Sequence, residues 1–317
     1  MNRFRYLLLS LLMAVVALSS CRKEEEIIPS SRVRVGVPGR PGKIKGFFLL
    51  NEANMGSNKA TLDYYDYTTA FYTRNIYAER NPNVVKELGD VGNDLQIHGS
   101  RLYAVINVSG LIEVMDVRTA KHIGKLSIPN CRYIAFKDGF AYVSSYAGPV
   151  KIDPNARLGY VAKVDTATLK VVAECPVGYQ PEELLIQGDK LYVANSGGYR
   201  APNYDKTISI IDLKTFTEEK QVDVAINLHR LQLDNYGKIW ASSRGDYKGV
   251  PSRLFVFDPK TKRVTKTLEV GCSNMALSGD SLFVYSSEWS YLTGKNTISY
   301  TVIDTKKQEV IDRNFIK

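Results

Sequence analysis

The sequence contains few of the residues that build metal centres, disulfide frameworks and histidine-based active sites. It has three histidines and four cysteines among 317 residues. Apart from Cys21 there are three cysteines, and an odd number cannot form a complete disulfide framework. They share no CxxC spacing and have no histidine at ligand spacing, so we predict no metal site. We expect Cys131 and Cys272 to be small packing residues.

Motifs for catalysis and for nucleic-acid binding are also missing. There is no HExxH, no Gly-x-Ser-x-Gly and no glycine-rich phosphate loop. The formal net charge of +9 is spread over turns and strand edges, which argues against a nucleic-acid partner. We therefore predict a non-enzymatic protein without catalytic residues or a cofactor. One acid–base pairing stays open, between Glu182 and either His229 or Arg230.

The amino-terminal segment predicts export and a lipid anchor. Leu7 to Leu18 is an apolar run too short to span a bilayer but typical of a signal peptide over residues 1–20. The following Leu-Ser-Ser-Cys resembles a lipobox, which implies lipidation of Cys21. Arg22 to Glu26 resembles the charged signal that sends Bacteroidetes lipoproteins to the outer face of the outer membrane. We expect residues 21–45 to form an extended tether, and the lipid to be the only membrane contact.

One repeat organises the rest of the chain, over residues 46–317. Six aspartates recur at intervals of 50, 49, 47, 46 and 46 residues, each closing an alternating or β-branched run. Each full repeat also has an apolar strand, an aromatic-rich strand and a strand after the aspartate. Four short strands at this period predict an all-β fold, a β-propeller of four-stranded blades. We interpret the aspartates as turn residues that accept backbone hydrogen bonds; they are Asp66, Asp116, Asp165, Asp212, Asp258 and Asp304.

The two ends of the repeat array look incomplete. The first repeat, from Phe47, lacks an innermost strand, and no closing strand follows the sixth repeat. Either six blades form a poorly latched ring, or the chain derives from a seven-bladed parent without its last blade. We favour the seven-bladed parent, because propellers usually close by letting one terminus complete the blade of the other.

The connections divide into two faces, and one face is far more elaborate. Long loops on one face of a rigid scaffold are where binding residues concentrate, and these loops are rich in Tyr, Trp and Arg. They are expected at Asn51–Ala60, Tyr146–Leu158, Ser196–Lys206, Arg244–Ser252 and Ser287–Lys295.

A second layer of polar residues is expected around the mouth of the central channel on this face. It consists of the pair that precedes each inner strand: Asn93-Asp94, Arg132-Tyr133, Glu182-Glu183, His229-Arg230 and Ser273-Asn274. Together the two layers predict a ligand-binding cup. Its candidate residues are Arg132, Tyr146, Glu182, Tyr199, Tyr204, Arg230, Arg244, Tyr247, Trp289 and Tyr291.

Two stretches carry a resemblance to known propellers. The repeat from Val177 to Val224 resembles the YncE-like or YVTN propeller repeat. The opening Phe48 to Ser57, leading to Leu62–Asp66, resembles cell-surface propeller lipoproteins of gut Bacteroidetes, among them the BtuG family. The resemblance covers Gly46 to Lys317. It implies a seven-bladed propeller that binds cobalamin or another corrinoid and passes it to a TonB-dependent outer-membrane transporter.

Other functions stay open from the residues themselves. A wide cup of aromatic, cationic and amide side chains also suits another small amphipathic ligand, such as an oligosaccharide, a haem or a peptide. A propeller enzyme, such as a lyase or hydrolase, would need a metal or an acid–base pair at the channel mouth. A scaffold for proteins or glycans would present a broad flat aromatic patch and no deep cup.

Overall fold

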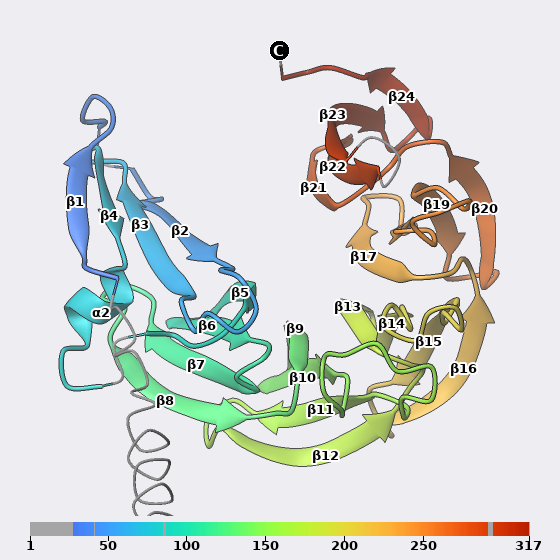
Figure 1. Ribbon diagram of the computed structural model, residues 1–317, viewed down its shortest axis with the longest axis horizontal. Helices are drawn as coiled ribbons and strands as arrows, with labels where there is room; N and C mark the ends of the chain where they lie inside the picture. Colours follow the sequence, from blue (N-terminus) through green and yellow to red (C-terminus); the bar gives the residue numbers. More distant parts are fainter. Residues whose placement is uncertain (1–27, 41, 85–86, 291–293, 317) are drawn as a thin grey trace, which may run out of the picture.

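Six four-stranded antiparallel sheets follow one another along an arc, coloured from blue to red in Figure 1. The computed structural model describes residues 28–40, 42–84, 87–290 and 294–316. The predicted signal peptide and Cys21 lie outside these residues. The sheets are numbered here as blades one to six in chain order. This architecture confirms the predicted all-β propeller with four strands per blade.

In blades two to six the chain runs from the inner to the outer edge of each sheet. The first strands lie on the inside of the arc in Figure 1 and the fourth strands on its outside. Blade two consists of β5 (Gly92–His98), β6 (Arg101–Ile106), β7 (Leu111–Asp116) and β8 (His122–Ser127). Blade three consists of β9 (Cys131–Lys137), β10 (Phe140–Ser145), β11 (Tyr160–Asp165) and β12 (Lys170–Pro176).

The last three blades follow the same order. Blade four is β13 (Pro181–Gln187), β14 (Lys190–Asn195), β15 (Thr207–Asp212) and β16 (Thr217–Asp223). Blade five is β17 (Leu228–Leu233), β18 (Ile239–Ser243), β19 (Arg253–Asp258) and β20 (Arg263–Leu268). Blade six is β21 (Asn274–Ser278), β22 (Ser281–Ser290), β23 (Lys295–Asp304) and β24 (Glu309–Asp312).

Blade one is built differently. Its strands are β1 (Ser31–Arg34), β2 (Gly46–Asn51), β3 (Thr61–Asp66) and β4 (Phe71–Arg74), in the order β1-β4-β3-β2. Because the turn aspartate Asp66 closes β3, β2 is the equivalent of a second strand. Within the described ranges no strand pairs with the inner side of β2, so the first repeat lacks an innermost strand there, as expected.

The fourth strand of blade one comes from the segment predicted to be a tether. β1 pairs antiparallel with β4 at the outer edge, with Ser31 opposite Arg74. The prediction of a wholly extended linker was wrong here, because β1 offers β4 a ladder partner at an edge that would otherwise be unpaired. A short helix, α2 (Ile76–Arg80), leads from blade one towards blade two. Among the described residues, no helix has the length and apolar character needed to cross a membrane.

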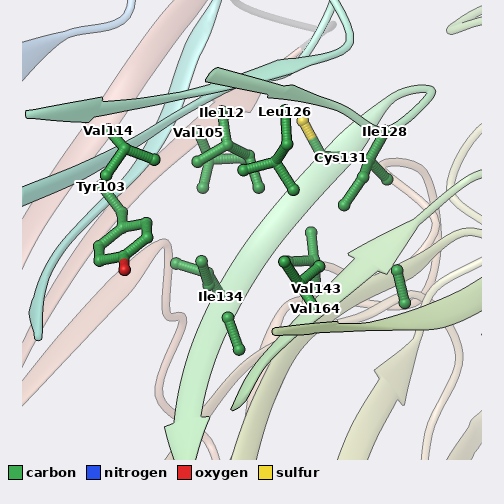
Figure 2. Close-up of a cluster of buried hydrophobic side chains, with 12 residues drawn as sticks. Tyr103, Val105, Ile112, Val114, Leu126, Ile128, Cys131, Ile134, Val143 and Val164 are labelled. Carbon is green, nitrogen blue, oxygen red and sulfur yellow. The ribbon is translucent and has the colours of Figure 1, made fainter. Parts of the chain in front are cut away.

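Apolar side chains from facing sheets form the core between neighbouring blades. Figure 2 shows one such cluster, between blades two and three. Ile112 and Val105 of blade two and Val143 of blade three are fully buried in it. Cys131 lies in the same cluster, and Cys272 is buried between blades five and six. Both thiols are free, as expected for packing residues.

The repeated aspartates close tight turns, as predicted. Asp165 Oδ1 accepts the N–H of Thr168 at 2.7 Å, the hydroxyl of Thr168 at 2.9 Å and the N–H of Ala167 at 3.0 Å. These hydrogen bonds lower the pKa of the Asp165 carboxyl. Each turn ends on a residue with positive φ, for example Leu169 with φ 55°. The aspartates therefore set the hairpins between third and fourth strands.

Packing between blades should dominate stability. Truncation of Ile112 to Ala leaves a cavity in a dense apolar cluster, so we expect a loss of about 3 kcal/mol of unfolding free energy. The matched control is Ile123→Ala on β8, where the side chain is 45% exposed and the expected change is within about 0.5 kcal/mol. Urea titrations followed by circular dichroism measure both. Equal losses for the two variants would contradict the packing described here.

Candidate functional site

The long connections between strands lie on one of the two faces of the propeller. Because neighbouring strands are antiparallel, successive connections alternate between the two faces. Four of the five predicted long loops lie between second and third strands, as expected. The fifth was wrong in part, because β22 extends to Ser290 and β23 begins at Lys295. Trp289 therefore lies on a strand, paired with Asn296, and Tyr291 lies outside the described residues.

The predicted polar pairs coincide with β-bulges at the start of four inner strands. In β13 the register shifts between Pro181 and Leu184, so Glu182 and Glu183 together oppose one residue of β14. Equivalent shifts occur in β5, β9 and β17. The pairs thus lie within the strands and not before them. A bulge re-aims side chains, and here it lets both members of a pair reach neighbouring blades.

Glu182 is the centre of the largest polar cluster. Its side chain is fully buried, and its carboxylate accepts Arg132 Nη2 at 2.9 Å, Arg244 Nη1 at 3.1 Å and the Tyr146 hydroxyl at 2.5 Å. Burial alone would raise the pKa of Glu182, but the two guanidinium groups outweigh it and hold the pKa below its ordinary value. Because Arg132 and Arg244 come from blades three and five, this carboxylate ties three blades together.

A second polar cluster joins the inner strands of blades three and five. The Tyr133 hydroxyl of blade three lies 2.8 Å from His229 Nε2 of blade five. The guanidinium of Arg230 stands 4.9 Å from the centre of the Tyr133 ring. Burial, reinforced by the nearby guanidinium groups, holds the pKa of His229 well below its ordinary value, so the ring is neutral. Its Nδ1 has no hydrogen-bond partner among the residues that the structure describes. The contact between Tyr133 and His229 therefore joins the inner strands of blades three and five.

Carboxylates of this cluster also join the inner strands. Glu183 Oε2 accepts the N–H of Leu231 at 2.7 Å and lies 3.3 Å from Arg230 Nε. Asp94 Oδ2 accepts the N–H of Ile134 at 3.0 Å. Burial raises the pKa of both carboxyl groups, that of Glu183 to about 7.

The acid–base pairing considered from the sequence is not formed. Glu182 is engaged by Arg132, Arg244 and Tyr146, whereas His229 contacts Tyr133 and Arg230 pairs with Glu183. A carboxylate whose lone pairs are taken by charged donors is a poor proton acceptor. In the described ranges, no group of three or more His, Cys, Asp and Glu side chains is arranged to hold a metal ion.

Next to the Glu182 cluster, a cavity of about 340 Å³ opens beneath the loop that follows β10. Its wall includes Tyr146, Gln180 and the charged side chains Lys151, Asp153 and Arg157. A hydrogen bond of 2.8 Å, from the N–H of Asp153 to the carbonyl of Tyr199, joins this loop to the equivalent loop of blade four. The loop after β10 thus forms most of the cavity wall, and two of the three charged side chains in that wall are cationic.

The structure brings together about half of the predicted site. Arg132, Tyr146, Glu182 and Arg244 form one cluster, and the Tyr199 ring packs against Tyr146 with centroids 6.3 Å apart. Arg230 belongs to the second cluster. Elsewhere on the loop face, Tyr204 is half-buried, and Tyr247 and Trp289 are exposed.

Several residues of the site were not among the ten candidates. Tyr133, Glu183, His229 and Asp94 were visible as members of the polar pairs, and that signal could have selected them. Arg157 was visible as one of the arginines in the long loops, whereas the cavity residues Gln180 and Lys151 gave no signal beyond their position in or beside such a loop.

Removing the central carboxylate should destabilise the fold strongly. Glu182→Ala leaves two buried guanidinium groups without their partner, so we expect a loss of about 3–5 kcal/mol of unfolding free energy. The control is Glu269→Ala, because Glu269 pairs with Arg253 at 2.8 Å but its side chain is 69% exposed. A surface pair of that kind contributes below about 1 kcal/mol. If urea titrations show similar losses of unfolding free energy for the two variants, Glu182 does not hold the three blades together.

The raised pKa of Glu183 should appear in the pH dependence of stability. Between its ordinary value of 4.5 and about 7, the folded chain holds a proton that the unfolded chain has released. Stability from this group therefore falls as pH rises through that window. We expect Glu183→Gln to lose less thermal stability than the parent between pH 5 and pH 7.5. The lowered pKa of His229 makes stability rise with pH, but this contribution is the same in the variant and the parent. If the melting temperatures of the two proteins change with pH in parallel, the assignment to Glu183 is contradicted.

Comparisons with known proteins support the architecture. A family model described as "Domain of unknown function (DUF5074)" matches residues 45–307. Hydrazine synthase of Kuenenia stuttgartiensis is similar with a TM-score of 0.57 and 19% identity, over 68% of this chain and 62% of that one. The Pan2 WD40 domain of Neurospora crassa is similar with a TM-score of 0.51 and 12% identity. The match covers 70% of this chain and 65% of that one. The chain thus spans less than two thirds of either structure, and at these identities the likeness concerns the fold alone. No curated protein matches.

Proposed function

The chain belongs to the DUF5074 family, and from its loop face we propose that it is a non-enzymatic protein that captures a ligand. The observation that carries this proposal is the cavity of about 340 Å³ that the loop after β10 forms together with Gln180. Lys151 and Arg157 border it with positive charge, and Tyr146 borders it with an aromatic ring. Ligand sites commonly combine apolar walls with a few placed polar groups.

The buried clusters support binding more than catalysis. The charges of Glu182, Arg132 and Arg244 are paired with one another, so these side chains form a rigid cluster beside the cavity. A rigid cluster at the start of the loops preorganises them and reduces the conformational entropy that is lost when a ligand binds. We therefore assign contact with the ligand to the loop residues around the cavity, with Tyr199 beside Tyr146, and assign a positioning role to Arg132, Glu182 and Arg244.

A corrinoid is the ligand we propose, on the resemblance to the BtuG family. The cavity is at the lower end of the volumes typical for small-molecule sites, so it would hold one arm of such a ligand and not the whole ring. Cobalamin carries a phosphate in its nucleotide arm, which suits Lys151 and Arg157. The exposed rings of Tyr247 and Trp289, 49% and 47% exposed, are then available to the macrocycle from the same face.

The proposal extends to the place of action. A lipid on Cys21 would hold the propeller at the outer face of the outer membrane, and the ligand would pass to a TonB-dependent transporter. The support is the sequence pattern around Cys21 and the charged residues that follow it.

Calorimetric titration with cyanocobalamin, with visible absorption in parallel, tests the ligand. We expect saturable binding, and a loss of about tenfold in affinity for Tyr247→Ala, because an exposed aromatic anchor typically contributes 1–2 kcal/mol. The control is Tyr236→Ala, since Tyr236 is 44% exposed but lies in the turn between β17 and β18, on the opposite face.

A second arm uses cobinamide, which lacks the nucleotide and its benzimidazole base. Weaker binding of cobinamide, with the difference reduced in Lys151→Ala, would support the assignment of the nucleotide arm to the cavity. Absence of heat and of any absorption change with both corrinoids would overturn the corrinoid proposal. Equal effects of Tyr247→Ala and Tyr236→Ala would place the ligand away from the loop face.

A further inference from the structure

A second cavity, of about 150 Å³, lies between blades one and two. Its wall takes residues from all four strands of blade one, from α2 and from the turn between β7 and β8. In Figure 1, α2 lies beside the outer strands of blade one. None of the residues of this wall belongs to the Glu182 cluster or to the larger cavity beside it, so the two places are separate.

One row of cross-strand neighbours runs across the sheet of blade one along this cavity. Arg32 of β1 is opposite Thr73 of β4, and Thr73 is opposite Tyr64 of β3. Tyr64 is in turn opposite Phe48 of β2, and their ring centroids are 4.8 Å apart. Side chains directly opposite each other on antiparallel strands share one face of the sheet. The row that lines the cavity therefore runs from an aromatic ring on β2 to a guanidinium group on β1.

Three guanidinium groups border the cavity, and they come from three separate elements. They belong to Arg32 of β1, Arg80 of α2 and Arg118 of the turn in blade two. Arg80 Nε lies 3.4 Å from Glu79 Oε1, and the guanidinium of Arg32 lies 4.3 Å from the centre of the Phe71 ring. Among the residues that the structure describes, no carboxylate forms an ion pair with Arg32 or Arg118. Two of the three cations in the wall thus have no anionic partner there.

The two carboxylates in the wall are already engaged. Asp66 Oδ1 accepts the N–H of Thr68 at 2.7 Å and the N–H of Thr69 at 3.2 Å. Glu79 Oε2 accepts the hydroxyl of Ser30 at 3.2 Å, while its other oxygen faces the guanidinium of α2. Three cations therefore stand against two carboxylates, and an anion that enters the cavity would balance the excess.

Buried asparagines hold the elements of this wall in place. Asn81 follows α2 and is 6% exposed; its Nδ2 donates to the carbonyl of Ala120 at 2.9 Å, and its Oδ1 accepts the N–H of His122 at 2.8 Å. Asn75 precedes α2, and its Nδ2 donates to the carbonyl of Ile28 at 2.8 Å. These hydrogen bonds fix α2 against the turn of blade two and against the segment that leads into β1. The three cationic positions are therefore set by the fold before a ligand arrives, which lowers the cost of binding.

We infer that this cavity binds a tetrahedral oxyanion of the phosphate or sulfate type, held by Arg32 and Arg118 with Arg80 beside them. The planar fork of a guanidinium group matches two oxygens of such an anion. A cavity of this size lies below the range of about 300–1,000 Å³ that is typical for drug-sized ligands, so it takes one small group. The group is either a free ion or the terminal phosphate of a larger molecule. The inference does not depend on the proposed corrinoid.

Calorimetric titration of the 317-residue chain with inorganic phosphate, at low ionic strength, tests the site. We expect saturable binding, and a loss of about tenfold in affinity for Arg118→Gln and for Arg32→Gln, because each variant removes charge-assisted hydrogen bonds. The control is Arg263→Gln, which changes the net charge equally at an exposed arginine of β20 in blade five. Its affinity for phosphate should equal that of the parent.

A variant that should gain affinity guards against effects of misfolding. Glu79→Gln removes a negative charge from the wall and frees Arg80, so we expect phosphate to bind roughly two- to fivefold more tightly. A partly unfolded protein would not bind more tightly. Unchanged or weaker binding by this variant would contradict a site beside α2.

Glycerol 3-phosphate distinguishes the two sources of the anion. Tighter binding of this ester than of inorganic phosphate would indicate the terminal phosphate of a larger molecule, and weaker binding would indicate the free ion; both results support the site. No saturable heat with either compound would overturn the inference. Equal losses for Arg118→Gln and Arg263→Gln would also overturn it, because net charge and not the cavity would then hold the anion. So would a loss in Lys151→Ala without one in Arg118→Gln, which would place the anion in the larger cavity.

Discussion

Burial of one blade face beneath the next is the interaction on which the rest of this structure depends. A single four-stranded blade cannot bury its own apolar faces, because each face needs a second sheet packed against it. Each blade therefore relies on its neighbours, as in other repeat architectures. An aromatic side chain at an equivalent position of each second strand contributes to these contacts. Trp240 shows the arrangement fully, since it is completely buried and its indole N–H donates to Asp234 at 2.9 Å.

The polar clusters around Glu182 and His229 form only because the blades stack on one another. They add to the stability from stacking and do not substitute for it. Stacked sheets bring their inner strands close, and bulges at equivalent places turn charged residues towards the axis. Arg132 and Arg244 then neutralise the fully buried carboxylate of Glu182. Isolated, any of these charges would be costly to bury, whereas together they fix the spacing of three blades. Tyr146 and Arg244 begin two of the long loops, so their contacts with Glu182 also hold the starts of these loops in place.

Much of the fold could be predicted from the sequence, because the information was periodic. The spacing from Asp66 to Asp304 fixed the number of repeats and the place of the hairpins, and the missing inner strand of blade one was visible from Phe47. The strand at Ser31–Arg34 was missed, since a short exposed segment gains its structure only from the free edge of β4. The length of the loop at Ser287–Lys295 was overestimated. Its aromatic and polar residues suit a binding loop, but the same residues also suit the extended ends of two paired strands.

The site was less predictable, since it depends on contacts across the arc. The sequence placed Glu182 and Arg132 at the channel mouth, but could not show that their charges would satisfy each other. It also could not show that Tyr133 and His229, from blades three and five, would meet on the axis. Contacts of that kind join residues that are almost one hundred positions apart, and no local pattern records them.

The chain contains two tryptophans, which allow the central claim to be measured directly. Trp240 is fully buried between blades five and six, whereas Trp289 is 47% exposed on the last sheet. With Trp289→Phe as background, acrylamide quenching of the fluorescence reports on Trp240 alone. The account predicts blue-shifted emission that acrylamide barely quenches. Emission and quenching close to those of free tryptophan would show that this face is not buried beneath the next blade, and would contradict the account.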